Sequence, residues 1–527
     1  MKSIKMRGIC AAVTGALLFG FGANAMADST TDIVNALVAK GVLTEEEGAL
    51  LNKGREGETA GQAKAMKKAT KLSVSDALDN AQIYGDIRVR YEDREGDGLA
   101  GGVASAAAGS PTVAINTGTS SITGATNISG VTGSTILPGA AYIKAGAGSS
   151  AAVAAKNITE RRERARYKVT MGVKTESGSW YSDLAVAMGS SGRSDNATFG
   201  ASFGSGTTGG QLNNKEALYI KRAMVGFKAT DWLTLEAGRM ENPLYTTPMV
   251  WDADLTWEGL SEKAKYKFND NLEVFGTAAQ IQYLGDKKSF FVGGGSSTTT
   301  NELLAFQGGA KYAINDKASA KFAITDYYYT HGHQGMTGAT GFAPGKGDAN
   351  ISNSSAVNDL DVIEIPAEIN YMVKDNIGIR LFGDYAWNTS ADERAKNSGL
   401  GLTGSSSSDD SAWMLGVQVG SAKDLKSFEG NKMKAGDWSA RLWYQEVGVW
   451  SIDQNGVDSD LFDSRVNMKG TAFKAKYNVQ DNVTLDFALA HADRKNDAFG
   501  TPTGAGNDLA MNLTKFDLMQ FDLTYKF

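Results

Sequence analysis

The chain alternates apolar and polar residues with a period of two over many short stretches. The stretch FDLMQFDLTYKF at 516–527 puts Phe527, Tyr525, Leu523, Phe521 and Met519 at every second position, and most positions between them are polar. Because successive strand side chains point to opposite faces, this stretch predicts a strand with one apolar and one polar face. A half-buried strand of a soluble sandwich has the same alternation, so one stretch does not decide the fold class.

A turn signature repeats between the alternating stretches. The segments YKFND, YAIND, YMVKD and YNVQD begin at Tyr266, Tyr312, Tyr371 and Tyr477, and FKATD begins at Phe227. Each places an aromatic residue four positions before an Asp that favours a tight turn. Aromatic residues at one height before the turns predict a ring of aromatic side chains near one membrane interface.

Long segments rich in Gly, Ser, Ala, Asn and Thr separate the strand pairs that the short turns connect. They cover roughly 95–158, 190–214, 241–255, 285–300, 331–359, 391–410, 451–464 and 494–512. Short turns on one side and long loops on the other predict an all-β transmembrane barrel, antiparallel and up-and-down, with about 16 strands. The expected strands are 82–94, 159–175, 179–189, 216–229, 232–240, 256–268, 272–284, 301–314, 318–330, 360–373, 377–390, 411–421, 437–450, 465–479, 483–493 and 513–527.

Proline positions test this assignment, because proline cannot donate a hydrogen bond to a sheet ladder. Of the 7 prolines, only Pro366 falls inside an expected strand, and the others fall in the expected long loops. We therefore expect a bulge or a local distortion at Pro366.

The N-terminal residues predict export. Residues 1–27 combine three basic residues, an apolar run and the pattern Ala-Met-Ala, which is typical of a signal peptide cleaved before Asp28. Its removal takes away the single Cys10, which excludes disulfides, thiolate metal sites and covalent haem from the mature chain. Residues 28–80 predict a short periplasmic helical segment, either an oligomerisation stalk, a cell-wall contact or a solvated tether, and residues 81–527 predict the barrel.

Composition bears on the partner and on the fold class. The formal net charge of −6, which becomes more negative once the basic signal is removed, makes nucleic acid an unsuitable partner. The 62 glycines and 7 prolines suit strands joined by loops better than helical domains.

Taken together, these features resemble those of bacterial porins, most closely the large porin family with a short N-terminal helical segment before a sixteen-stranded barrel. The resemblance rests on the signal, the terminal Phe527, the loop asymmetry and the stretch VNALVAKGVLTEEEGALL at 34–51. It implies that the barrel-assembly machinery recognises Phe527, that the barrel lies among outer-membrane lipid and lipopolysaccharide, and that it forms a homotrimer. The last strand must also pair with the first, at 83–92, since an open edge is not tolerated in lipid.

Basic residues mark two neighbouring strands on the face opposite their apolar residues. They are Arg88 and Arg90 on the first strand and Arg162, Arg164, Arg166 and Lys168 on the second. We expect them to face the lumen, because an arginine facing lipid costs roughly 2–4 kcal/mol at the midplane. The resemblance implies that the third loop folds inward, so Glu241, Asp252 and Asp254 would oppose this basic row at a constriction. Alternatively, these charges only solvate the lumen wall or the external mouth.

Catalytic and metal-binding motifs are not evident. The three histidines, His331, His333 and His491, lie outside any lipase pattern, and two histidines do not complete a metal site. The sequence therefore predicts a non-enzymatic porin without a cofactor, for passive diffusion of small hydrophilic solutes and with a mild anion preference. The alternative is a structural barrel, or a sheath for a partner such as an electron-transfer cytochrome.

Overall fold

A computed structural model describes residues 79–99, 102–107, 110–115, 157–189, 195–199, 216–284, 301–329, 336–337, 355–356, 360–397, 409–421, 434–497, 508–509 and 512–527. The chain divides into two units, Met1–Asp76 and Ala77–Phe527, and the described residues all belong to the second. The predicted signal at 1–27 and the predicted helical segment at 28–80, except for its last two residues, lie outside the described part of the chain.

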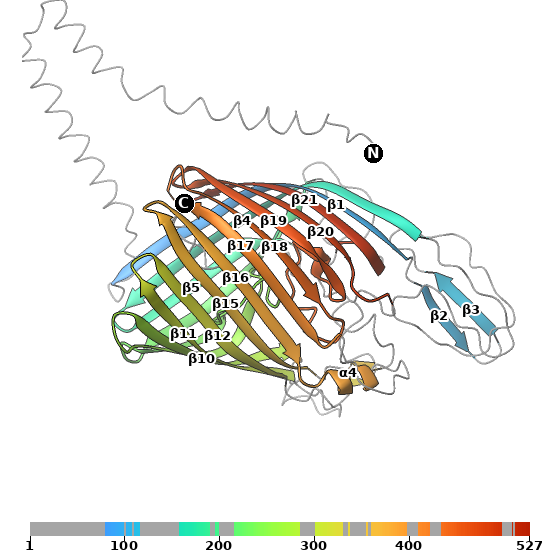
Figure 1. The fold of residues 1–527 in the computed structure, drawn as a ribbon, viewed down its shortest axis with the longest axis horizontal. Coiled ribbons are helices and arrows are strands. Elements are labelled where there is room, and N and C mark those ends of the chain that lie inside the picture. The colour runs from blue at the N-terminus through green and yellow to red at the C-terminus, as the bar shows by residue number, and fades with distance from the viewer. Residues whose placement is uncertain are drawn as a thin grey trace, which may run out of the picture. The chain divides into compact units, whose positions relative to one another are not determined.

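Sixteen strands form the wall of a barrel (Figure 1). They are β1 (Asn80–Leu99), β4 (Asn157–Ser177), β5 (Trp180–Met188), β7 (Leu218–Lys228), β8 (Leu233–Glu241), β9 (Thr256–Lys267), β10 (Leu272–Leu284), β11 (Asn301–Asn315), β12 (Ala318–Tyr329), β15 (Asp361–Lys374), β16 (Ile377–Asn388), β17 (Ser411–Ser421), β18 (Trp438–Val447), β19 (Met468–Gln480), β20 (Val483–Arg494) and β21 (Asn512–Lys526). Each pairs antiparallel with the next, so the predicted sixteen-stranded, up-and-down arrangement is confirmed.

The first and last strands close the barrel, as the sequence predicted. β1 and β21 pair from Asp86 opposite Lys526 to Leu99 opposite Asn512. At the end of this ladder the Phe527 amide donates to the Gly85 carbonyl at 3.0 Å, and the Gly85 amide donates back to Phe527 at 3.1 Å. Closure removes the open edge that lipid would leave without hydrogen-bond partners.

The smaller elements lie on the connections between wall strands. They are β2 (Gly102–Ala107) and β3 (Ser110–Ile115), which form a hairpin, β6 (Ala197–Thr198), β13 (Met336–Thr337), β14 (Ser355–Ala356), helix α4 (Ala391–Asn397) and the 3₁₀ turn η2 (Phe462–Ser464) (Figure 1). The short β6 pairs with β4 beyond the point where β5 ends. No helix in the described part of the chain is long and apolar enough to cross a membrane.

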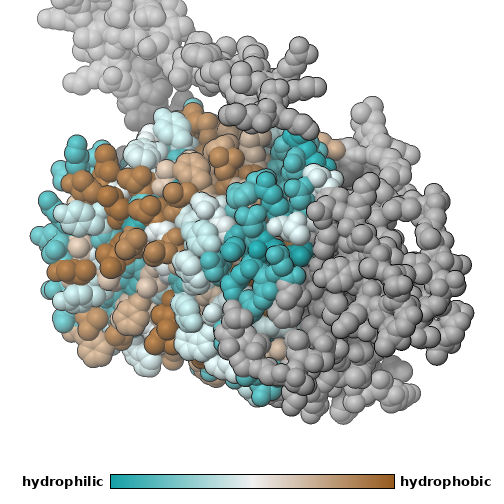
Figure 2. Space-filling view, turned by 45° about the vertical axis from the view of Figure 1, so that its right-hand side comes forward, coloured by the Kyte–Doolittle hydropathy of each residue, from teal (hydrophilic) through white to brown (hydrophobic). Residues whose placement is uncertain are grey.

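Side-chain alternation assigns the two faces of the wall. On β1, Ile87 and Val89 are each 44 % exposed, whereas Arg90 and Glu92, which lie on the opposite parity, are buried. Figure 2 shows apolar side chains gathered on the outer surface of the barrel. The predicted aromatic ring is also present at the short-turn ends, where Tyr266, Tyr312, Tyr371 and Tyr477 are exposed and Phe227 packs on Trp180. The apolar parity therefore faces outward, as expected for contact with lipid.

A charge on this outer face should destabilise the barrel. Val89→Arg is expected to lower the free energy of unfolding in a bilayer by about 2–4 kcal/mol, because Val89 lies between Ile87 and Tyr91 in the middle of the apolar parity of β1. Reversible urea unfolding in liposomes would measure the change. Val89→Leu is the control and should remain near the wild-type value; an arginine variant of equal stability would contradict the assigned membrane face.

Pro366 interrupts one ladder without shifting its register. β15 pairs with β16 through Pro366, but the ladder between β12 and β15 lacks the pairs between Phe322 opposite Ala367 and Thr325 opposite Glu364. The register on both sides of this gap is the same. The predicted local distortion is thus confirmed as missing ladder pairs, whereas a bulge at this position is wrong, since a bulge would have changed the register.

A candidate constriction inside the barrel

The two basic strands lie side by side with their charged residues directly opposite each other. Arg88 pairs in register with Lys168, and Arg90 with Arg166. Like charges opposite each other on a sheet are destabilising unless other groups compensate them. The compensating groups are carboxylates and the amide groups of Asn196.

Two carboxylates hold Arg90. Its Nε and Nη2 donate to the two oxygens of Asp522 on β21 at 2.8 and 2.9 Å, and its Nη1 donates to Asp460 at 2.7 Å. Its neighbour Arg88 donates to the Asn196 side chain at 2.7 Å. A bidentate pair with one carboxylate fixes the planar guanidinium, so Arg90 is a structural anchor in addition to a lumen charge.

The predicted residues of β4 are paired as well. Arg162 and Arg164 both contact Asp508, and Arg164 also donates to Glu92. Arg166 donates to the Asn196 carbonyl at 3.3 Å and lies 3.6 Å from Glu92, and Lys168 lies 3.9 Å from both Asp86 and Asp195. The whole predicted basic row therefore has anionic or amide partners.

The third loop, residues 242–255 between β8 and β9, contacts strands that are not adjacent to β8 or β9. The Tyr245 amide donates to Gln307 on β11 at 2.9 Å, and Thr246 donates to Glu364 on β15 at 2.6 Å. The next residue, Thr247, donates to Asp384 on β16. From β9 these strands lie two, four and five places along the ring, so the third loop leaves the wall at β8 and β9 and extends across the lumen.

Each of the three predicted acids has a different environment. Asp254 faces the basic wall: burial raises the pKa of its carboxyl, but Lys168, Lys221 and Arg88 outweigh burial and lower it. Asp252 instead accepts hydrogen bonds from the Ser459 amide and hydroxyl, both at 3.0 Å.

The expected place of Glu241 needs correction. It is the last residue of β8 and pairs with Arg222 of β7, while its side chain is 70 % exposed. Because Glu241 precedes the crossing part of the third loop, it does not oppose the basic row.

A second inward segment was missed by the sequence analysis. Residues 448–467, here called the inner segment, connect β18 and β19, and nearly all of them are buried. Asp453 accepts hydrogen bonds from Tyr283 on β10 and Tyr329 on β12, while Asp460 at the other end pairs with Arg90 on β1. The inner segment therefore spans the lumen between opposite walls.

The third loop and the inner segment also bind each other. The Asp252 amide donates to the Gly456 carbonyl at 2.6 Å, and the Asp458 amide donates to the Pro248 carbonyl at 3.1 Å. Apolar residues of both segments, including Val250 and Ile452, belong to one buried cluster with the inner wall. The two segments thus form a joint layer across the barrel.

The inner segment holds a strained turn. Phe462, Asp463 and Ser464 have φ values of 53°, 57° and 60°, in the left-handed region that is unfavourable for residues other than glycine. Asp463 holds the turn, since it pairs with Arg465 at 3.0 Å and accepts the amide of Asp508 at 2.7 Å. Strain of this kind persists only where the surroundings fix it.

Arginines lower the pKa of loop carboxyls at this layer. Burial raises the pKa of Asp508, but Arg94, Arg164 and Arg166 outweigh it and lower the pKa to about 2. For Asp460, burial is likewise outweighed by Arg90 and Arg94, and its pKa falls well below the usual value. Both carboxylates therefore stay ionised in mildly acidic solution.

Asp508 should make the stability depend on pH in a defined window. Its folded pKa lies below the unfolded value of about 3.9, so its stabilisation is complete above about pH 4 and is lost as the pH falls toward about 2. Asp508→Asn is expected to reduce the slope of unfolding free energy against pH in this window, measured by chemical unfolding in detergent. Asp231→Asn, at an exposed turn, is the control and should keep the wild-type slope; equal slopes in all three proteins would contradict the role of Asp508.

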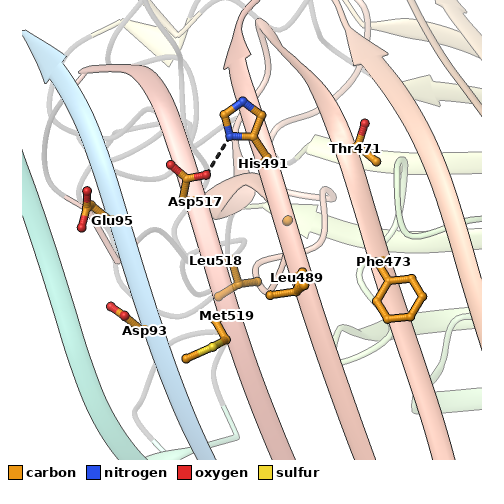
Figure 3. Close-up of a pocket in the computed structure, with 10 residues that line it drawn as sticks. Asp93, Glu95, Thr471, Phe473, Leu489, His491, Asp517, Leu518 and Met519 are labelled. Carbon is orange, nitrogen blue, oxygen red and sulfur yellow. Dashed lines mark hydrogen bonds and ion pairs between the residues drawn. The ribbon is translucent and has the colours of Figure 1, made fainter. Parts of the chain in front are cut away.

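A pocket on the outer face of the wall contains the single described histidine (Figure 3). His491 on β20 hydrogen-bonds through Nδ1 to Asp517 at 2.7 Å, and its Nε2 lies 3.6 Å from Asp493. Both ring nitrogens therefore lie beside carboxylates. Within the described ranges, no three His, Cys, Asp or Glu side chains are grouped as metal ligands.

Comparison with protein families decides the class of this barrel. The family model described as "Putative porin" matches residues 62–356 and 356–527, which is most of the chain. The chain belongs to this family. A porin is an outer-membrane channel, and the closed barrel, the apolar outer face and the charged inner wall fit that class.

Solved structures give distant similarities. The outer-membrane channel DcaP of Acinetobacter baumannii has 10 % identity and a TM-score of 0.35, with 86 % of this chain and 99 % of that chain covered. Pseudomonas putida OprB has 10 % identity and a TM-score of 0.39, with 85 % and 94 % covered. No curated protein matches the chain.

Proposed function

We propose that this porin passes small hydrophilic solutes and ions by passive diffusion and that it prefers anions. The observation that supports this proposal most directly is the charged inner wall of a closed barrel whose outer wall is apolar. Buried Arg90, Arg94 and Arg166 inside the barrel contrast with exposed Ile87 and Val89 outside it. Such a wall suits aqueous solutes, because charge in the membrane is tolerated only where water or partners surround it.

The basic row alone is not sufficient for anion selectivity. Its members are paired with Asp460, Asp508, Asp522 and Glu92, so their charges are partly cancelled at the constriction. Two lysines on the opposite wall add positive charge to the lumen. They are Lys265 and Lys311, which have no ion pair within the part of the chain that the structure describes. The proposed preference rests on both groups.

Reversal potentials across a planar bilayer in a KCl gradient test the proposal. We expect the reversal potential to lie on the side of the chloride equilibrium potential. In the triple variant Arg162→Gln, Arg164→Gln, Arg166→Gln it should move toward the potassium equilibrium potential, because Asp508 and Glu92 would keep Arg94 but lose their other cationic partners on β4. A cation-selective channel that the triple variant leaves unchanged would refute the anion preference. Absence of any conductance from folded protein would refute the diffusion function.

A structural barrel is the second candidate. The joint layer of the third loop and the inner segment favours it, because two buried segments occupy the lumen and bind each other. The same layer disfavours a sheath, since a cytochrome threaded through the barrel would have to displace both segments. Very low conductance in the bilayer experiment would support the structural candidate.

A further inference from the structure

Two buried carboxyl groups lie next to each other where the third loop meets the wall. They belong to Glu364 on β15 and Asp384 on β16, which are 0 % and 4 % exposed. Glu364 is the register partner of Ala386, two positions from Asp384, so the two acids are diagonal neighbours on the inner face of the wall. Their carboxyl groups lie within hydrogen-bonding distance of each other. Two ionised carboxylates at this separation would repel each other.

No cation compensates this carboxyl pair in the described part of the chain. The register partners of the pair on the neighbouring strands are all uncharged: Thr325 on β12, Ala386 on β16, Pro366 on β15 and Met414 on β17. The nearest basic residue on the two strands is Arg380, which lies four positions from Asp384 and pairs with Glu368 at 3.3 Å. On β12, the Lys321 ammonium lies over the ring of Tyr245. The pair therefore has no positive partner of its own.

Three hydroxyl groups donate to three of the four oxygens of the pair. Tyr327 of β12 donates to one oxygen of Glu364 at 2.5 Å, and Thr246 of the third loop donates to the other at 2.6 Å. Thr247 donates to Oδ2 of Asp384. The remaining oxygen, Oδ1 of Asp384, is buried without a hydrogen-bond partner among the described residues. One donor is thus missing from an otherwise complete set.

A proton shared by the two carboxyl groups supplies this donor. When Glu364 carries the proton, its hydroxyl can donate to Oδ1 of Asp384, and all four oxygens have partners. The Tyr385 amide also lies near Asp384 but leaves Oδ1 unpaired. Buried polar groups are nearly always hydrogen-bonded, and two carboxyl groups in contact do not both ionise. The geometry therefore favours one proton and one negative charge on the pair.

The same pair fixes two consecutive residues of the third loop. Thr246 is bound to one member of the pair and Thr247 to the other, so both anchors depend on the two carboxyl groups staying together. The residue before them, Tyr245, is held separately by Gln307 through its amide and its carbonyl. Repulsion within the pair would therefore loosen the third loop beyond Tyr245.

We propose that Glu364 and Asp384 are positioning residues of the channel, which share one proton at neutral pH and thereby hold the third loop across the lumen. In alkaline solution hydroxide takes this proton as water and leaves two adjacent anions without a cation. The anions repel each other, the hold on Thr246 and Thr247 weakens, and the path past the third loop widens. The effect on conduction rests on the proposed diffusion function, whereas the shared proton and the position of the loop do not require conduction.

Infrared spectroscopy of the purified full-length protein tests the shared proton. A protonated carboxyl group has a carbonyl stretching band that a carboxylate lacks. We expect the wild type at neutral pH to show this band more strongly than Glu364→Gln, because the glutamine amide donates to Asp384 without a titratable proton. Bands of equal intensity in the two proteins would contradict the shared proton.

Hydrogen exchange measured by mass spectrometry tests the hold on residues 242–255. The wild type and Glu364→Gln are compared at the same pH, so the intrinsic pH dependence of exchange cancels. Past about pH 9 we expect faster exchange in the wild type than in Glu364→Gln, because buried glutamates are known to ionise at about pH 8–9. Single-channel conductance should rise over this range in the wild type and stay level in Glu364→Gln. Equal exchange of the two proteins throughout would overturn the positioning role.

Glu236→Gln is the matched control. Glu236 on β8 also accepts hydrogen bonds from a tyrosine and a serine, Tyr181 and Ser261, but it pairs with Lys263 at 2.7 Å and does not contact the third loop. Because its charge has a cationic partner, Glu236→Gln should keep both the infrared band and the alkaline response of the wild type. Equal effects of Glu236→Gln and Glu364→Gln would overturn the assignment.

The measurements separate this inference from the diffusion function. A conducting channel that lacks the infrared difference and the alkaline change in exchange refutes the role of the pair and leaves the diffusion function intact. A folded protein that shows both but does not conduct supports the pair as the anchor of the third loop and refutes the diffusion function.

Discussion

Replacing residues 450–464 with a short glycine-serine turn is expected to raise the single-channel conductance several-fold. These residues belong to the inner segment, which spans the lumen from Asp453 at β10 and β12 to Asp460 at β1. Removing them opens the middle of the barrel, while the sixteen-stranded ladder, which does not include them, remains closed. Conductance in a planar bilayer, with a heat-dependent shift in electrophoretic mobility as proof of folding, is the measurement.

A less drastic variant separates the inner segment from the barrel as a whole. Asp460→Asn keeps the segment but weakens its anchor on Arg90, so it should increase current fluctuations more than mean conductance. If the folded deletion variant conducts like the wild type, the inner segment does not limit the passage of ions. The third loop alone would then form the constriction.

Arg90→Ala is expected to lower the free energy of unfolding by about 3–5 kcal/mol. The Arg90 side chain is 1 % exposed and compensates both Asp522 on β21 and Asp460 on the inner segment. Its removal leaves two carboxylates without their main cation, at the strand pair that closes the barrel. Urea unfolding in liposomes would measure the loss.

Arg161→Ala is the matched control for this substitution. Arg161 lies on the neighbouring strand and pairs with Asp93 at 2.6 Å, but its side chain is 52 % exposed on the outer face. An exposed pair of this kind contributes about 0–1 kcal/mol, so its loss should change stability little. Similar losses in the two variants would show that burial of the Arg90 cluster is not what stabilises the closure.

The strands and their two faces could be predicted because they depend on local patterns. The expected strand at 272–284 matches β10 in both bounds, and the expected 411–421 matches β17. On β1, buried Arg90 also lies on the parity opposite exposed Ile87 and Val89. Period-two alternation, turn residues and proline positions are properties of neighbouring residues, which is why they suffice for these features.

The partners of the site residues could not be predicted, because they come from distant parts of the chain. Arg90 pairs with Asp460 and Asp522, which are more than 300 residues away in sequence. The inner segment did carry one signal: Trp450, Ile452 and Phe462 make it more apolar than the glycine- and serine-rich loops. Apolar residues in a connection between two wall strands indicate that the connection is buried.

The hydrogen bonds between Gly85 and Phe527 have a consequence for biogenesis. Because β1 has its final neighbour in β21, a chain that still lacks β21 has no way to complete the ring. Every such intermediate is an open sheet with two unpaired edge strands. The contacts between β1 and β21, which remove these edges, have the greatest sequence separation in the fold. Truncated products would therefore remain open sheets exposed to degradation, so ring closure itself distinguishes complete chains from incomplete ones.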